Sequence, residues 1–238
     1  MPRYDYDLNV FFREDDVSYY LLGAYITDGC IATDKHSNRK RALLYSKDRD
    51  WLELIRDLIC PEKPVSTEKK NLHANRLTID SIPLGNWFIS KGCVPAKSLI
   101  LKWPEVPDQY LPDFIRGCID GDGCLSFNRY IRKDRNHNTE VRIRAGLCSS
   151  SVAFIARFSK VLNEHKIKHW ICKQYSAGNN STLKNGYVIT ATTDNYEVRI
   201  DGKHAQQFLR WIYYPGHKLS MPRKLTIAET IINHQFKK

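Results

Sequence analysis

The stretch LGAYITDGCI at residues 22–31 decides the fold of this chain, because it recurs as RGCIDGDGCL at residues 116–125. The offset between the two copies is constant, 122 − 28 = 94 residues. Helix-start signals precede each copy, an acidic run at 14–16 and a Pro-Asp pair at 112–113. Strand-like sequence follows each copy. A repeat at this spacing predicts two copies of one structural unit within the chain.

The likeness between the halves continues downstream of the repeated stretch. Residues 46–55 align with 149–158, and both are predicted to be amphipathic helices. Alternating stretches at 76–80, 187–193 and 197–200 predict strands, and a closing helix at 82–90 has a counterpart at 205–213. Each half therefore follows the order helix, hairpin, helix, hairpin, helix. This order predicts a duplicated α+β fold of two αββαββα units and excludes a doubly wound sheet.

We expect an N-terminal half at residues 1–97, a stiff linker at 98–112 and a C-terminal half at 113–238. Prolines 104, 107 and 112 interrupt both helix and strand in the linker. A run rich in Asn, Ser, Lys and Gly at 179–186 predicts a loop in the second half that the first half lacks.

Charge and composition narrow the partner. Among 238 residues, 37 Lys and Arg outnumber 26 Asp and Glu, which gives a net charge of +11 and favours a polyanion such as nucleic acid or an anionic membrane. No apolar run approaches the ~20 residues of a spanning helix, so we expect no membrane partner. The seven cysteines contain no C-x-x-C pair, and the N-terminus has no apolar signal stretch. We therefore expect an intracellular protein, in the cytoplasm, nucleoid or an organelle.

The repeated stretch resembles the LAGLIDADG signature of homing endonucleases, in the single-chain form that carries two motifs. Gly23 and Gly117 occupy the position where two motif helices pass closest, and the missing Cβ permits backbone contact. Gly29 and Gly123 suit a left-handed helix end. Asp28 and Asp122 then fall at the ends of paired helices. Asp120 matches the first acid of the signature, but its equivalent is Ile26, so we interpret it as a structural cap.

The resemblance implies chemistry for the paired acids. Two carboxylates a few ångströms apart repel each other unless hard cations bind between them. Mg²⁺ is the expected ion, Mn²⁺ is expected to substitute, and Ca²⁺ is expected to support binding without cleavage. By resemblance, the backbone carbonyls of Thr27 and Gly121 add metal ligands. The number of bound metals stays open.

Two lysines are implied for the catalytic pocket. Residues 92–98, GCVPAKS, resemble the family's Pro-x-Lys-Ser stretch, whose lysine points into the pocket, and this implies Lys97. Its partner in the second half is expected near residues 221–225, where both Arg223 and Lys224 stay open as the cation, with Lys224 our choice.

Strands in which cationic and apolar residues alternate place their charge on one face. Arg142 and Arg144 alternate with Val141 and Ile143 in this way. By resemblance, two four-stranded antiparallel sheets form a saddle over a long, asymmetric DNA duplex, with arginine reading guanine. The expected DNA-contacting residues are Arg39, Lys40, Arg41, Arg76, Thr78, Asn128, Arg129, Arg132, Lys133, Arg135, Arg142, Arg144, Lys173, Gln174 and Arg199.

These features predict a site-specific DNA endonuclease that makes a metal-dependent double-strand break, acting as a monomer with an internal pseudo-dimer and without a protein partner. An RNA maturase, or a non-cleaving nucleic-acid-binding protein on the same scaffold, stays open as the alternative. Retention of both acids favours the nuclease, because a pure binding protein has no need for two costly adjacent carboxylates. The tripeptide Asn136-His137-Asn138 is a weak match to HNH nucleases, and His165 and His169 lack an acid between them.

Overall fold

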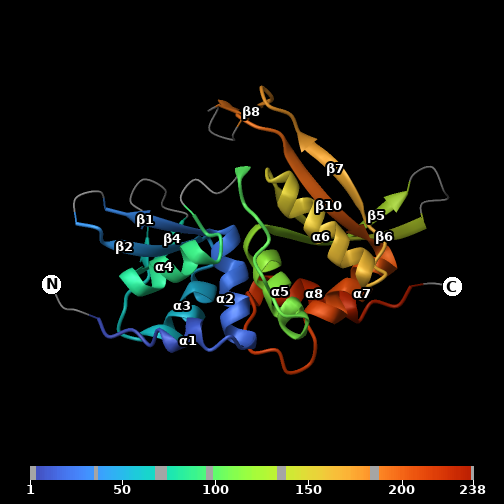
Figure 1. Cartoon of the computed structure of the whole chain (residues 1–238). Coiled ribbons are helices and arrows are strands. Elements are labelled where there is room, and N and C mark those ends of the chain that lie inside the picture. The colour runs from blue at the N-terminus through green and yellow to red at the C-terminus, as the bar shows by residue number, and fades with distance from the viewer. Residues whose placement is uncertain are drawn as a thin grey trace.

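Two four-stranded antiparallel sheets flank a central pair of helices (Figure 1). The computed structural model describes residues 4–34, 37–67, 74–94, 99–132, 138–182 and 188–236, with the side chains of residues 132, 138 and 139 left out. The first sheet has the order β1-β2-β4-β3 and the second the order β5-β6-β10-β7. The strands of the first sheet are β1 (Gly29–Thr33), β2 (Lys40–Ser46), β3 (Ser66–Thr67) and β4 (Asn75–Asp80). Those of the second are β5 (Gly123–Arg132), β6 (Asn138–Ser149), β7 (Trp170–Tyr175) and β10 (Asn195–Asp201).

The two sheets have the same strand order, so the duplication seen in the sequence is also a duplication of topology. The helices of the first half are α1 (Asn9–Phe12), α2 (Asp16–Thr27), α3 (Arg49–Ile59) and α4 (Ile82–Ser90). Those of the second half are α5 (Leu111–Asp122), α6 (Val152–Glu164), α7 (Gly202–Ile212) and α8 (Pro222–Ile232), preceded by a 3₁₀ turn at Asp108–Tyr110. The duplicated α+β plan is therefore confirmed.

Three elements fall outside the plan expected from the sequence. Helices α1 and α8 were not predicted. Residues 179–186 were expected to form a loop, but β8 (Asn180–Thr182) pairs with β9 (Val188–Thr190) as a small antiparallel ladder beyond β7 and β10 (Figure 1). β9 lies within residues 187–193, where a strand was predicted. β8 was not predicted, because its residues Asn180, Ser181 and Thr182 are all polar and show no apolar alternation. Residues 183–186 of the expected loop lie outside the described residues.

Side-chain oxygens stabilise the starts of the main helices. Asp15 accepts the backbone N–H of Ser18, and the Ser18 hydroxyl accepts the N–H of Asp15, so α2 begins with a reciprocal capping box. Ser81 accepts the N–H of Leu84 at the start of α4, and Ser151 accepts that of Phe154 at the start of α6. These caps explain why each helix begins where it does.

Each sheet is covered by helices on one face only. In β6, Val141, Ile143, Ala145 and Leu147 point to that face, and the last three are buried. The opposite face of each sheet is the one that the described helices do not cover, and we call it the outer face. Because side chains alternate along a strand, even-numbered residues of β4, β5, β6 and β7 lie on the outer face.

Helices α2 and α5 cross at two glycines. A methyl group at Gly23 would collide with the carbonyl oxygen of Phe114, and one at Gly117 would collide with that of Tyr20. The surrounding positions are apolar and fully buried, including Leu21, Leu22 and Ile115. The seam between the halves is therefore a backbone-to-backbone contact.

The expected left-handed conformation of Gly29 and Gly123 is wrong. Neither has a positive φ, and Gly123 is extended at φ −77° and ψ 156°. A Cβ at Gly123 would lie 2.6 Å from the Cα of Ile119, and one at Gly29 would lie 2.6 Å from that of Tyr25. Glycine is needed there because the first strand residue turns back against the last helical turn.

Among the described helices, none is long and apolar enough to cross a membrane.

Candidate active site and nucleic-acid interface

The two motif helices end beside each other. Asp28 is the C-cap residue of α2, and Asp122 is the last residue of α5. A Cβ placed on Gly121 would lie 3.6 Å from the carboxylate carbon of Asp28 and would collide with the Thr27 hydroxyl. The Asp28 side chain thus lies against the backbone one residue before Asp122. The negative ends of two helix dipoles and two carboxylates meet here, which favours a bound cation.

Lys224 supplies a positive charge to the adjoining ends of α2 and α5. Its Nζ donates to the carbonyl oxygens of Ile119, Asp120, Gly121 and Gly123 at 2.7–2.8 Å, so it caps the end of α5 from α8. Burial lowers the pKa of Lys224 from its ordinary value, and the charges of Asp120, Asp28 and Asp122 act against that change. The Gly121 carbonyl, expected as a metal ligand, is one acceptor, and its second lone pair leaves room for a metal.

The structure separates the two candidate cations of α8. Arg223 forms a two-point ion pair with Asp48, through Nε to Oδ1 at 2.7 Å and Nη2 to Oδ2 at 2.8 Å. It therefore ties the second half to the loop before α3. Lys224, by contrast, lies among the acids of the motif helices. Lys97 lies outside the described residues.

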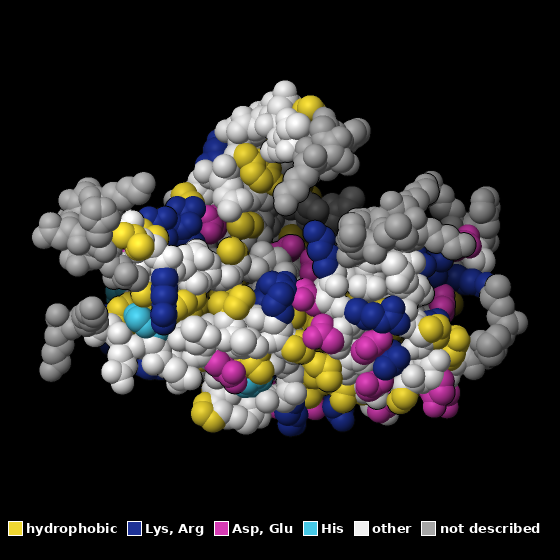
Figure 2. Space-filling model, turned by 180° about the vertical axis from the view of Figure 1, so that it is seen from behind, with side chains coloured by type: hydrophobic (Ala, Val, Ile, Leu, Met, Phe, Trp, Pro, Cys, Tyr) yellow, Lys and Arg dark blue, Asp and Glu magenta, His cyan; other side chains and the backbone are white. Residues whose placement is uncertain are grey.

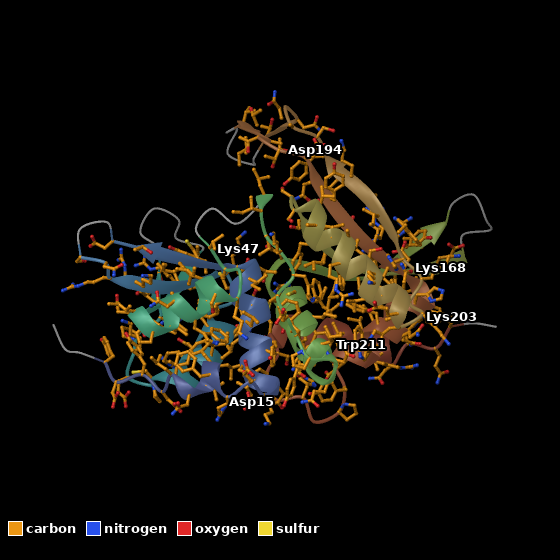
Figure 3. All side chains as sticks on the ribbon, in the orientation of Figure 1. Asp15, Lys47, Lys168, Asp194, Lys203 and Trp211 are labelled. Carbon is orange, nitrogen blue, oxygen red and sulfur yellow. The ribbon has the colours of Figure 1, made fainter. Side chains whose placement is uncertain are left out.

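A cavity of about 310 Å³ opens beside Asp122. It is lined by Ile26, Thr27, Leu101, Asp122, Cys148, Ser149, Ser150, Gln174, Tyr175 and Asn195. Gln174 was expected to contact DNA and lies here, where β7 ends. Figure 3 shows neighbouring Asp194 at the upper end of the β7–β10 pair, where the chain continues into the β8–β9 ladder.

Sequence reasoning missed Ser149, Ser150 and Asn195 as residues of this cavity. Their place in the sequence could have identified them. Polar residues at the end of β6 and at the start of β10 lie together where these strands approach the motif helices. Lys47 follows β2 at the equivalent turn of the first half, and it is exposed near the end of α2 (Figure 3).

Asp120 serves the seam between the halves. Its fully buried carboxylate accepts hydrogen bonds from the Tyr20 hydroxyl at 2.8 Å, the Tyr213 hydroxyl at 2.6 Å and the backbone N–H of Met221 at 2.7 Å. The Tyr20 hydroxyl in turn accepts the indole N–H of Trp51 at 2.7 Å. Burial raises the pKa of Asp120, while these hydrogen bonds oppose the change. Asp120 is thus structural, as expected, but it caps the start of α8 and not its own helix.

A second buried polar group holds the segment between α7 and α8. Arg116 donates to the carbonyls of Ile212 and Leu219 and to Asp113 at 2.6–2.7 Å. Both side chains of this ion pair are almost completely buried. Together with Asp120, Arg116 fixes the path of the chain that brings Lys224 to the motif helices.

Most of the expected DNA-contacting residues lie on the outer faces. Those placed there by the strand registers are Arg41, Arg76, Thr78, Asn128, Arg142, Arg144, Gln174 and Arg199. Arg39 is exposed beside the β1–β2 turn. Lys133 and Arg135 lie outside the described residues, as does the side chain of Arg132.

Three expected residues lie on the helix-covered side instead. The stem of Lys40 packs against Gly85 of α4, where an added Cβ would lie 2.6 Å from the Lys40 Cβ. Arg129 lies over the ring of Phe127, and Lys173 donates to Asp194 at 2.6 Å beside Tyr196. Strand alternation turns these three side chains away from the outer face. These three side chains therefore do not share the outer face with the other expected residues.

The described residues on the rear face of the molecule carry charges of both signs. Figure 2 shows Lys and Arg side chains interspersed with Asp and Glu on this side.

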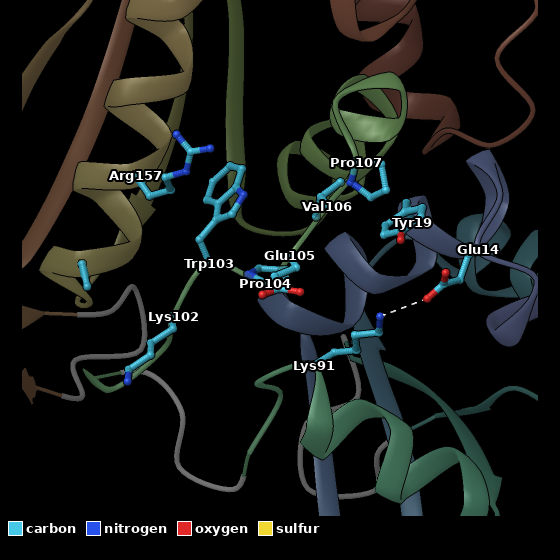
Figure 4. Close-up of a pocket in the computed structure, with 11 residues that line it drawn as sticks. Glu14, Tyr19, Lys91, Lys102, Trp103, Pro104, Glu105, Val106, Pro107 and Arg157 are labelled. Atoms are coloured by element: carbon cyan, nitrogen blue, oxygen red, sulfur yellow. Dashed lines mark hydrogen bonds and ion pairs between the residues drawn. The ribbon is translucent and has the colours of Figure 1, made fainter.

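A second, larger cavity of about 720 Å³ lies between the linker, α2 and the start of α6, and Figure 4 shows the residues that line it. Lys91 pairs there with Glu14 at 3.2 Å, and Lys102 and Arg157 are accompanied by Glu105. This mixed lining includes neither Asp28 nor Asp122.

The donor set at the motif ends consists of oxygen atoms. Among the described residues, no group of three or more His, Cys, Asp or Glu side chains is arranged as a metal site. Two carboxylates supplemented by backbone carbonyls match the oxygen ligands that Mg²⁺ and Ca²⁺ prefer. Asp28 and Asp122 with the carbonyls of Thr27 and Gly121 therefore fit a divalent cation.

Comparison with known proteins identifies the fold. No protein-family model matches the chain, and no curated protein sequence matches it. Solved structures do match. The I-LtrWI LAGLIDADG homing endonuclease bound to target DNA is 12% identical, with a TM-score of 0.51 and 90% coverage of both chains. The I-SmaMI LAGLIDADG homing endonuclease bound to cleaved DNA is 9% identical, with a TM-score of 0.56 and coverage of 88% of this chain and 85% of that one.

A further structure, I-SmaMI bound to an uncleaved DNA target in the presence of calcium ions, is 9% identical, with a TM-score of 0.52 and 90% coverage of both chains. All three are single-chain LAGLIDADG homing endonucleases. The chain therefore has the fold of the single-chain LAGLIDADG homing endonucleases.

Proposed function

We propose that this protein is a site-specific DNA endonuclease that makes a metal-dependent double-strand break by phosphodiester hydrolysis. The observation that carries the proposal is the meeting of Asp28 and Asp122 at adjoining helix ends, beside a buried lysine and a polar cavity. Two acids in this position weaken both helix ends by about 0.3–1 kcal/mol each. A chain that only bound nucleic acid would gain nothing from them.

Asp28 and Asp122 would hold the metal, with the Thr27 and Gly121 carbonyls as further ligands. A bound divalent cation would activate water and neutralise charge on the leaving oxygen. Lys224 holds the end of α5, and thereby Asp122, in place while its charge lies beside both acids. Lys97 is proposed as the equivalent cation of the first half. Mg²⁺ is the proposed ion, with Mn²⁺ able to substitute.

The proposed substrate is a long, asymmetric DNA duplex. The outer faces of the two sheets carry different side chains, such as Arg41 and Thr78 on the first and Arg144 and Arg199 on the second. A two-stranded ribbon fits the major groove, and each sheet would occupy one half-site. One chain supplies both halves, so we propose that the protein acts as a monomer.

Selection from a randomised duplex library tests this function. The protein is incubated with the library in Mg²⁺, in Mn²⁺ and in Ca²⁺, and cleaved and bound duplexes are sequenced separately. We expect one recurring sequence to be cut on both strands in Mg²⁺ and Mn²⁺, and the same sequence to be bound but uncut in Ca²⁺. Binding without cleavage in all three ions, or binding of structured RNA alone, would overturn the proposal in favour of a binding protein.

A further inference from the structure

Two arginines on the outer face of the second sheet are held by acids. Arg144 and Asp201 are direct cross-strand partners of β6 and β10, and the Arg144 Nε lies 3.1 Å from the Asp201 Oδ1. Arg199 donates to the Glu197 Oε2 from Nη2 at 2.6 Å and from Nε at 3.2 Å. Both acids bind the Nε side of the guanidinium group. Because Nη1 lies on the opposite side of the guanidinium group, the Nη1 atoms of both arginines point away from these carboxylates.

The position of Glu197 depends on a glycine. Glu197 is only 2% exposed although it lies on the outer face. A Cβ at Gly146, the cross-strand partner of Arg199, would lie 2.9 Å from both the Glu197 Oε1 and the Val198 carbonyl oxygen. Gly146 thus leaves the space in which the carboxylate lies. Burying a carboxylate is costly unless a cation pairs with it, and Arg199 is that cation.

The neighbouring Arg142 is also held in one orientation. Its guanidinium group lies 5.3 Å from the centre of the Tyr130 ring, and the Tyr130 hydroxyl donates to Glu140 at 2.8 Å. Cation–π contact with a fixed ring restricts the arginine as an ion pair does. The outer face of the second sheet therefore presents arginines whose orientation is set before any ligand arrives.

These contacts are not those of a surface built to bind phosphates. Arg144 and Asp201 cancel in charge, as do Arg199 and Glu197, and an acid on a DNA-facing surface repels the phosphate backbone. What each arginine retains is a fixed edge of hydrogen-bond donors. Asp201, whose side chain is 31% exposed, adds an acceptor beside Arg144, whereas the buried Glu197 only positions Arg199. In the major groove a G·C pair presents the N7 and O6 acceptors of guanine beside the N4 amino donor of cytosine. The Arg144–Asp201 pair is complementary to a G·C base pair, and the donor edge of Arg199 is complementary to guanine.

We propose that Arg144 and Arg199 read guanines in the major groove of the second half-site, and that Asp201 and Glu197 are positioning residues that set this preference. The inference rests on the proposed function, because it requires duplex DNA on the outer face. A thymine at the same place would turn its O4 acceptor toward Asp201, so the acid also disfavours A·T pairs.

The test compares base preference and affinity in the full-length protein. Duplexes bound in Ca²⁺ are selected from a randomised library with the wild type, Arg144→Lys, Asp201→Asn and Glu197→Gln. Arg39→Lys serves as the matched control, because Arg39 is exposed in the first half. Folding of each variant is checked by urea denaturation. Lysine retains the charge of arginine but not its planar fork.

We expect the wild type to select G·C pairs at two or more positions of one half-site. Arg144→Lys should lower the preference for guanine about tenfold or more at one of these positions. Asp201→Asn should broaden the same position and at the same time tighten binding to DNA of unrelated sequence. Glu197→Gln should act in the same way at a second position, and Arg39→Lys should change neither of them.

Two results would overturn the inference while leaving the proposed function intact. The first is a wild-type target with no G·C pair at the position that Arg144→Lys affects. The second is an unchanged base preference in Asp201→Asn and Glu197→Gln variants that fold. Failure of the wild type to select any duplex would overturn the proposed function and this inference together. A merely structural role for the acids would lower stability without raising the affinity for unrelated DNA.

Discussion

The carboxylate of Asp120 accepts the hydroxyl hydrogen of Tyr20 at 2.8 Å, across 100 residues of chain and across the seam of the motif helices. The equivalent position of the first motif is Ile26, so this contact exists once in the duplicated structure. It links the core of the first half, through Trp51, to the start of α8 in the second. The segment held by this contact leads into α8, which carries Lys224 to the end of α5.

Tyr20→Phe should destabilise the protein by about 1–3 kcal/mol, because the indole N–H of Trp51 would lose its acceptor and Asp120 one donor in the core. Urea denaturation measures the change. Tyr19→Phe is the control, because the Tyr19 ring stacks on Tyr110 at 5.0 Å and keeps that contact in the variant. Equal stabilities of the two variants would show that the seam does not depend on this network.

Gly117→Ala should lower the melting temperature, because the new methyl group would collide with the Tyr20 carbonyl oxygen. The expected loss is about 1–3 kcal/mol, or roughly 2–4 °C for each kcal/mol. Helix propensity alone would stabilise the variant by about 1 kcal/mol. A rise in melting temperature would therefore mean that the helices do not touch at this residue.

Asp28→Asn and Asp122→Asn should each abolish double-strand cleavage while leaving target binding largely intact. Loss of the metal removes several kcal/mol of transition-state stabilisation, which corresponds to about a thousandfold or more in rate. Plasmid linearisation and a binding assay in Ca²⁺ measure the two effects. Asp57→Asn, at an exposed acid of α3, is the control. Cleavage near the wild-type rate in either motif variant would rule out this site.

Lys224→Met should lower both stability and cleavage. Methionine keeps much of the aliphatic volume but leaves the carbonyls at the end of α5 without their donor, at a cost of about 1–3 kcal/mol. Arg223→Met, the adjacent control, loses the ion pair with Asp48 and a weak contact with the Met221 sulfur. Urea denaturation and cleavage assays on both variants separate the role of Lys224 from that of Arg223. Wild-type cleavage by Lys224→Met would remove Lys224 from the active centre.

Asp48 should make a pH-dependent contribution to stability. Its hydrogen bonds with Arg223 hold the pKa of Asp48 below its ordinary value. An acid whose pKa is lower in the folded state stabilises the protein above its unfolded pKa, about 3.9, and the gain is lost as the pH falls through the folded value. The pair is partly exposed, so we expect at most about 1 kcal/mol. The stability difference between wild type and Asp48→Asn should be present at pH 7 and decline as the pH falls below the ordinary aspartate pKa; a difference that grew with acid would contradict this.

The duplicated stretch at residues 22–31 and 116–125, the alternation downstream of it and the family resemblance together predicted the paired helices, the matching sheets and the position of the two acids at the helix ends. These features depend on local order along the chain, namely a motif, a helix cap and an alternation of period two. The same alternation predicted the buried residues of β6 and the outward direction of Arg142 and Arg144.

Only the tertiary structure decided which residues act together across long separations. It placed Lys224, and not Arg223, beside the motif acids, and it turned Lys40, Arg129 and Lys173 from the outer face. It gave Asp120 three hydrogen-bond donors, one from α2, one from the turn after α7 and one from the residue before α8. It also set Glu197 and Asp201 against the arginines. Periodicity assigns a side chain to a face, but its partners depend on which strands and helices pack together, and that is a property of the whole fold.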